Sequence, residues 1–170
     1  SGTELNARAI FKAAGLSYED MGKVEFLPYA ESVELIKNRQ LDATLQSSGL
    51  GMAAIRDLAA TMPINFVEVP EDVILKINNP AYQHGVIPAS TYEGQTADVS
   101  TVAIQNLFVT QAGVSDDLAY QMTKLMFEHL DRLGNAHSAA KAIQLDKATK
   151  NLPAPLHPGA ERYFKEVGAL

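Results

Sequence analysis

The chain has 170 residues, 46% of them apolar, and its 14 Lys and Arg against 20 Asp and Glu give a net charge of −6. This length suits one ordinary domain or two small lobes. The acidic balance argues against nucleic acid as a partner, because binding to phosphates needs clustered Lys and Arg. The chain has no cysteine, which excludes disulfides, thiolate metal sites and cysteine nucleophiles. No apolar run approaches the roughly 20 residues of a membrane-spanning helix.

The first residues predict a helix that begins at residue 1. Ser1 and Glu4 have the spacing of a capping box. Leu5 and Ala9 begin an apolar stripe, and Gly15 stands where a left-handed C-cap belongs. Because the chain starts at a cap and not in a loose tail, we expect the natural chain to continue upstream of this fragment.

Helices and strands alternate over the first third of the chain. Short apolar runs predict strands at residues 24–27, 41–45 and 64–69, and helical spacing predicts helices at 31–37 and 52–60. This alternation is typical of an α/β fold with a mainly parallel sheet covered by helices.

The pattern changes in the second half. Residues 73–98 contain several Pro and Gly breaks, which indicates a crossover or hinge region. Residues 101–110 predict a long apolar strand interrupted by Gln105 and Asn106. Ser115 then caps a helix that we expect to end at Gly134.

The apolar residues of that helix predict a buried stripe made of Leu118, Met122, Leu125, Met126 and Leu133. Shorter helices are expected at residues 136–143, 145–149 and 158–167, with Pro158 at the first helical position.

Catalytic and metal-binding patterns are weak. No two of the histidines, which are His84, His129, His137 and His157, stand at i, i+4 spacing, so no zinc site of the usual histidine pattern is predicted. The chain lacks a Gly-x-Ser-x-Gly elbow, a Walker loop and a Gly-x-Gly-x-x-Gly loop. We therefore expect no metal, no cofactor and no enzymatic activity.

Two segments suit a small anion. The helix start at Ser1, Gly2 and Thr3 offers backbone N–H groups and hydroxyls. The loop Gln46-Ser47-Ser48-Gly49 follows a predicted strand end and precedes a helix. Locally, each has an ordinary alternative: Ser1 caps its own helix, and the loop is a simple turn.

Several segments together carry a family resemblance. They are residues 1–8 beginning Ser-Gly-Thr-Glu, 41–43, Ser47-Ser48-Gly49, 87–95 with Thr-Tyr-Glu-Gly-Gln, 98–103, 106–107 and 156–160. In this order the chain resembles the solute-binding subunits of TRAP transporters of the TAXI type, the TRAP-associated extracytoplasmic immunogenic proteins. The resemblance covers nearly the whole chain. Gln105 departs from it, because that position is commonly Pro in the family.

The resemblance implies a type II periplasmic-binding-protein fold, with two α/β lobes hinged around a cleft. The chain is then an incomplete fragment that lacks most of the first lobe. On this interpretation residues 1–80 form most of the second lobe, 81–100 the crossover or hinge, and 101–170 the C-terminal part of the first lobe. Ligands lie between the lobes in such proteins, which makes the two anion-suited segments ligand-binding candidates and adds Tyr92 and Asn106.

The implied function is extracytoplasmic, in the periplasm: capture of a small organic anion or amino acid, glutamate-like or a dicarboxylate, and delivery to the TRAP membrane subunits. At the helix start, the Thr3 hydroxyl is expected to donate to a ligand carboxylate. Two alternatives stay open. One is an enzyme on the same fold acting on a small anionic substrate, and the other is the ligand-sensing domain of a regulator.

Overall fold

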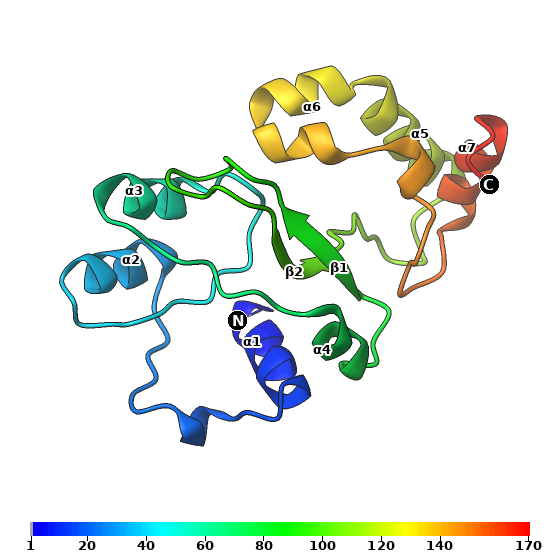
Figure 1. Ribbon diagram of the computed structural model, residues 1–170. Coiled ribbons are helices and arrows are strands. Elements are labelled where there is room, and N and C mark those ends of the chain that lie inside the picture. The colour runs from blue at the N-terminus through cyan, green and yellow to red at the C-terminus, as the bar shows by residue number, and fades with distance from the viewer. Residues whose placement is uncertain (1) are drawn as a thin grey trace. The chain divides into compact units, whose positions relative to one another are not determined.

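The computed structural model describes residues 2–170, without the side chain of Ser138, so the capping box and the ligand contact predicted at Ser1 lie outside the described residues. The chain divides into two compact units, the first ending at Ile104 and the second extending from Gln105 to Leu170 (Figure 1). The assignment of residues 1–80, 81–100 and 101–170 to lobes stays a prediction.

The first unit contains four α-helices, a 3-10 turn and two strands among its described residues. These are α1 (Gly2–Ala13), η1 (Tyr18–Asp20), α2 (Tyr29–Lys37), α3 (Ala53–Thr61), α4 (Glu71–Lys76), β1 (Tyr82–Ile87) and β2 (Val99–Ile104). Helix α2 packs beside α3, and α4 contacts both α1 and β1 (Figure 1). The helices predicted at the chain start, at 31–37 and at 52–60 are thus confirmed within a residue or two.

Helix α1 ends as its sequence predicts. Gly15 has a φ of 75°, the left-handed conformation that favours glycine. The Leu16 N–H donates to the Phe11 carbonyl at 2.8 Å, which closes a Schellman-type end.

The sheet differs from the prediction. Strands β1 and β2 form a two-stranded antiparallel pair, with Tyr82 opposite Ile104 and Ile87 opposite Val99. The expected parallel sheet is wrong for residues 2–170, and β1 lies inside the region predicted to be irregular. The fold is a mixed α/β arrangement that is mostly helical.

The apolar runs predicted as strands lack partners. Residues 24–27 and 41–45 make no backbone–backbone hydrogen bond to the described part of the chain. Residues 64–69 make one such bond, from the Val69 N–H to the Ser100 carbonyl at 3.0 Å. The predicted strand at 101–110 stops at Ile104. A strand exists only where a neighbour supplies the ladder, and an apolar run alone does not reveal that neighbour.

The second unit is helical. It contains α5 (Asp116–Glu128), α6 (Leu130–Ala136), η2 (Ser138–Ala142), η3 (Leu145–Lys147) and α7 (Pro158–Glu166). Ser115 caps α5 and Pro158 opens α7, as predicted. The single long helix expected up to Gly134 is wrong, because the chain leaves helical geometry at His129 and Gly134 lies inside α6. The pieces predicted at 136–143 and 145–149 are short 3-10 turns.

The buried face of α5 also differs from the predicted stripe. Ala119 and Thr123 are buried, whereas Leu118 and Leu125 are about half exposed, at 53% and 51%. Helix α7 approaches so closely that a Cβ added at Gly159 would lie 2.1 Å from the Asp116 carbonyl oxygen. The close approach of the two helices therefore depends on the absence of a side chain at Gly159.

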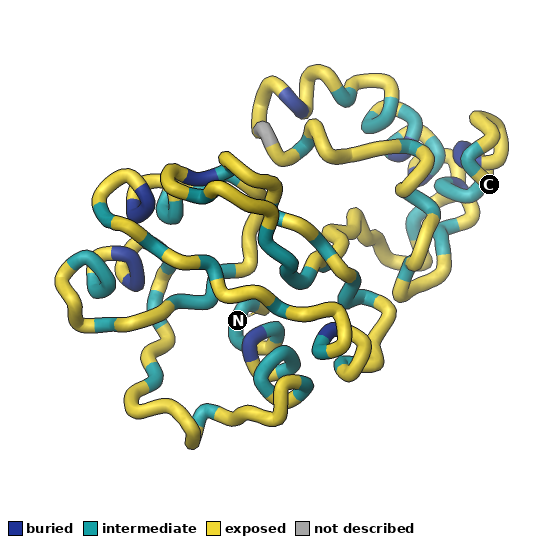
Figure 2. Tube along the Cα trace, viewed as in Figure 1, coloured by how far each residue is buried: buried dark blue, intermediate teal, exposed yellow. Residues whose placement is uncertain are grey.

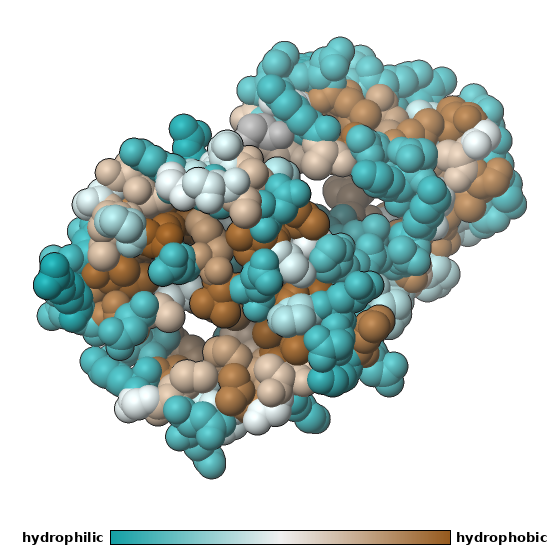
Figure 3. All heavy atoms as spheres, viewed as in Figure 1, coloured by the Kyte–Doolittle hydropathy of each residue, from teal (hydrophilic) through white to brown (hydrophobic). Residues whose placement is uncertain are grey.

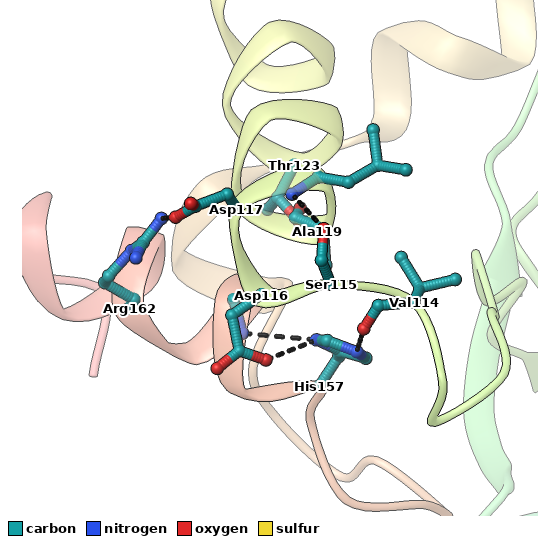
Figure 4. Close-up of polar contacts among 10 residues, drawn as sticks. Val114, Ser115, Asp116, Asp117, Ala119, Thr123, His157 and Arg162 are labelled. Atoms are coloured by element: carbon teal, nitrogen blue, oxygen red, sulfur yellow. Dashed lines mark hydrogen bonds and ion pairs between the residues drawn. The ribbon is translucent and has the colours of Figure 1, made fainter.

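Polar contacts hold the same two helices together. The Arg162 side chain of α7 pairs with Asp117 of α5 at 2.9 Å (Figure 4). His157 contacts the Val114 carbonyl through Nε2 at 3.0 Å and accepts from the Gly159 N–H through Nδ1 at 3.2 Å (Figure 4). Since a carbonyl only accepts, Nε2 carries the proton of a neutral His157.

Each unit has a small core, and dark blue segments are sparse along the tube in Figure 2. The buried apolar residues are Ala7, Val33, Leu58, Ala59, Ile74 and Tyr92 in the first unit and Ala119, Tyr163 and Phe164 in the second. Apolar side chains also reach the surface of both units (Figure 3). None of the helices in residues 2–170 is long and apolar enough to cross a membrane.

Candidate functional site

The Tyr29 hydroxyl joins two segments that the sequence predicts as ligand-binding. It lies 2.5 Å from Thr3 Oγ1 at the start of α1. The same hydroxyl contacts the Ser47 carbonyl oxygen at 2.8 Å and the Ser47 N–H at 3.3 Å. Tyr29 begins α2, directly after Pro28, so the helix start directs its side chain across both segments.

Asn6 extends this arrangement to the sheet. Its Nδ2 donates to Ser47 Oγ at 3.1 Å, and its Oδ1 accepts from the Tyr82 hydroxyl at 3.0 Å. Tyr82 is the first residue of β1. We call Thr3, Asn6, Tyr29, Ser47 and Tyr82 the hydroxyl cluster. It connects α1, α2, the loop before α3 and β1.

Sequence reasoning placed Thr3 and Ser47 in the site but missed Asn6, Tyr29 and Tyr82. Asn6 stands one helical turn after Thr3 on the predicted first helix, which was an available signal. No local sequence pattern indicates this role for Tyr29 and Tyr82, because their contacts are with residues far away in the sequence.

Gln46 lies beside the hydroxyl cluster. Its Nε2 points to the Tyr29 carbonyl at 3.5 Å, a long contact. Its Oε1 is enclosed and has no hydrogen-bond partner within the described part of the chain. Because a carbonyl oxygen cannot pair with another carbonyl oxygen, the contact favours the amide orientation with Nε2 toward Tyr29, in which Oε1 is an acceptor without a donor.

Three further predicted residues, Gly2, Ser48 and Gly49, lie at the exposed edge of these segments. Gly2 opens α1, and a Cβ at this position would meet no atom within 4 Å. The Ser48 hydroxyl contacts the Gly49 carbonyl at 3.3 Å. Their ligand contacts stay predictions.

Tyr92 has different surroundings. It is 5% exposed, its ring stacks on Phe66 at 5.1 Å, and its hydroxyl accepts from the Gly51 N–H at 3.1 Å. It borders a surface recess lined by α3 residues such as Arg56 and by residues 90–96. Asn106 is exposed and belongs to the second unit. The ligand contacts predicted for these two residues also stay predictions.

The hydroxyl cluster consists of uncharged groups. The nearest ion pair along α1 joins Glu4 to Arg8 at 2.6 Å. Burial raises the pKa of Tyr18, and the neighbouring Glu4 carboxylate raises that pKa further. Between residues 2 and 170 we find no group of three or more His, Asp or Glu side chains able to hold a metal ion. The cluster itself supplies hydrogen-bond donors and acceptors and no charged group.

A comparison with known protein families identifies the family of this chain. Residues 1–168 match the NMT1-like family, so the chain belongs to that family. Its relatives are periplasmic-binding-protein-like, and its members are generally solute-binding proteins, typically extracytoplasmic, and not enzymes.

Proposed function

We propose that the protein is an extracytoplasmic solute-binding subunit that captures a small organic anion or amino acid and delivers it to the membrane subunits of a TRAP transporter. The solute is glutamate-like or a dicarboxylate. Family membership supports the solute-binding class. The TAXI-type resemblance of the motifs supports the transporter partner.

One observation carries the location of the site. Thr3 and Ser47, chosen from two separate segments on sequence grounds, converge on the single hydroxyl of Tyr29. On this proposal, the backbone N–H groups at the start of α1 and the loop hydroxyls supply the donors and acceptors for the solute. Binding needs no covalent step.

The fold proposal follows the family. We place the two units in the hinged lobes of a type II periplasmic-binding-protein fold, with residues 1–80 in the second lobe, 81–100 as the crossover and 101–170 in the first lobe. Closure of such lobes holds the solute until it is released to the permease.

The test is to identify the solute and then to disrupt the hydroxyl cluster. Mass spectrometry of molecules released from gently purified protein identifies the solute, and calorimetry measures its affinity. Asn6→Ala removes the two amide bonds that hold Ser47 and Tyr82 in the hydroxyl cluster, so the cluster loses its arrangement and binding should weaken about tenfold, which corresponds to about 1.4 kcal/mol.

Asn65→Ala is the matched control, because Asn65 is exposed and lies outside the hydroxyl cluster. It should leave affinity unchanged. Failure of every small anion and amino acid to bind would contradict the proposed function. Equal affinities for the Asn6 variant and the wild type would move the site elsewhere.

A further inference from the structure

The direction of one hydrogen bond is determined by proton counting. The Tyr29 hydroxyl has a single proton and lies 2.8 Å from the Ser47 carbonyl oxygen. A carbonyl oxygen only accepts, so Tyr29 donates its proton there. The Ser47 N–H donates to the oxygen of the same hydroxyl at 3.3 Å.

This leaves Thr3 one role. Its Oγ1 lies 2.5 Å from the Tyr29 oxygen, and the Tyr29 proton is already donated to the Ser47 carbonyl oxygen. Thr3 must therefore donate to Tyr29. Its hydroxyl then has lone pairs but no proton for a solute, which reverses the expected donation from Thr3 to a ligand carboxylate.

A second free acceptor adjoins Tyr29. Gln46 Oε1 is enclosed and has no partner within residues 2–170, and Nε2 of the same amide points to the Tyr29 carbonyl at 3.5 Å. A buried acceptor without a partner is unfavourable, so a donor that reaches Oε1 is favoured.

We propose that Tyr29 is a specificity-determining residue, holding Thr3 as an acceptor so that the solute group placed against Thr3 carries an N–H or O–H. The inference rests on the proposed function and sharpens it. Among anionic solutes it favours one that also bears an ammonium or hydroxyl group over a plain dicarboxylate.

Neutron diffraction of the deuterated free protein tests the bond direction without any solute. We expect the Thr3 deuteron on the line to the Tyr29 oxygen and the Tyr29 deuteron on the line to the Ser47 carbonyl. A Tyr29 deuteron directed at Thr3 would overturn the proposal, whether or not the protein binds solutes.

Calorimetry with L-glutamate and glutarate tests the consequence, because these probes differ by one ammonium group. Wild-type protein should prefer L-glutamate about tenfold or more, as expected for a charge-assisted bond. In Tyr29→Phe the Thr3 hydroxyl is free to donate, so the preference should fall about tenfold. Thr3→Val, which removes the acceptor and keeps Tyr29, should lower it similarly.

Tyr18→Phe is the matched control, because the Tyr18 hydroxyl contacts Glu4 on α1 and lies outside the hydroxyl cluster. It should keep the wild-type preference. An unchanged preference in folded Tyr29→Phe and Thr3→Val would refute the role of Tyr29. If neither probe binds wild-type protein, the amino-acid solute of the proposed function is wrong, and the deuteron positions still decide the direction of the bond.

Discussion

The two units differ in the kind of contact that stabilises each of them internally. In the first unit, hydroxyl and amide groups from four segments meet around Tyr29 and Asn6. In the second, α5 and α7 pack closely at Gly159, and an aromatic group of Tyr120, Phe127, Tyr163 and Phe164 lies between them. Directional polar contacts suit recognition, whereas close packing suits stability, so each unit is expected to respond to a different kind of substitution.

The largest loss of stability is expected at the α5–α7 crossing. In Gly159→Ala the new Cβ would lie 2.1 Å from the Asp116 carbonyl oxygen and 2.7 Å from the Tyr120 nitrogen, so the two backbones must separate. Overpacking against backbone should cost about 3 kcal/mol or more. Denaturant unfolding measures it.

Gly113→Ala is the control, because a Cβ there meets no atom within 4 Å and its backbone does not require glycine. It should leave stability nearly unchanged. Equal unfolding midpoints for both variants would contradict close packing as the basis of the second unit.

A smaller loss is expected for the polar link at the start of α7. His157→Ala removes the cap on the Gly159 N–H and the bond to the Val114 carbonyl, and should cost about 2 kcal/mol (Figure 4). His129→Ala, at an exposed position, is the matched control. Hydrogen exchange of the α7 amides should increase in the first variant only, and protection retained there would show that packing alone fixes the helix.

In the first unit, Tyr29→Phe should reduce stability by about 1–2 kcal/mol, because it removes the hydroxyl shared by Thr3 and Ser47. Thr3→Val should cost less, since it removes one of these bonds. Thermal unfolding of both single variants and the double variant measures the coupling between them. Additive losses would show that the two hydroxyls do not act together.

The smallest effect concerns alkaline pH in the second unit. The Tyr120 hydroxyl donates to Glu166 at 2.7 Å, and this bond, more than burial, raises the pKa of Tyr120. A raised pKa means that the stabilisation is fully present below about pH 10 and is lost as pH rises through the folded pKa. Phenolate absorbance of wild type and Tyr120→Phe checks this, and a Tyr120 that ionises at the ordinary tyrosine pH would contradict it.

The helices were largely predictable because their signals are local. Gly15 ends α1, Ser115 caps α5 and Pro158 opens α7, each through contacts within a few residues. The break at His129 was missed, because the apolar spacing continues through it.

The strands were not predictable, because pairing depends on distant residues. Gly85 counted as a breaker in the sequence, yet β1 requires it: a Cβ there would lie 2.8 Å from the Ala103 Cβ on β2. The candidate site shows the same limit. Thr3 and Ser47 lie in segments with local signals, while the role of Tyr29 comes from its contacts with both.

The central claim is that the start of α1 and the loop at residues 46–49 form one solute site around Tyr29. Amide NMR of labelled protein titrated with L-glutamate tests it most directly. We predict that the resonances of Thr3, Ser47 and Ser48 shift together and give one dissociation constant. Shifts confined to residues 90–96, or different dissociation constants for the two segments, would contradict the claim.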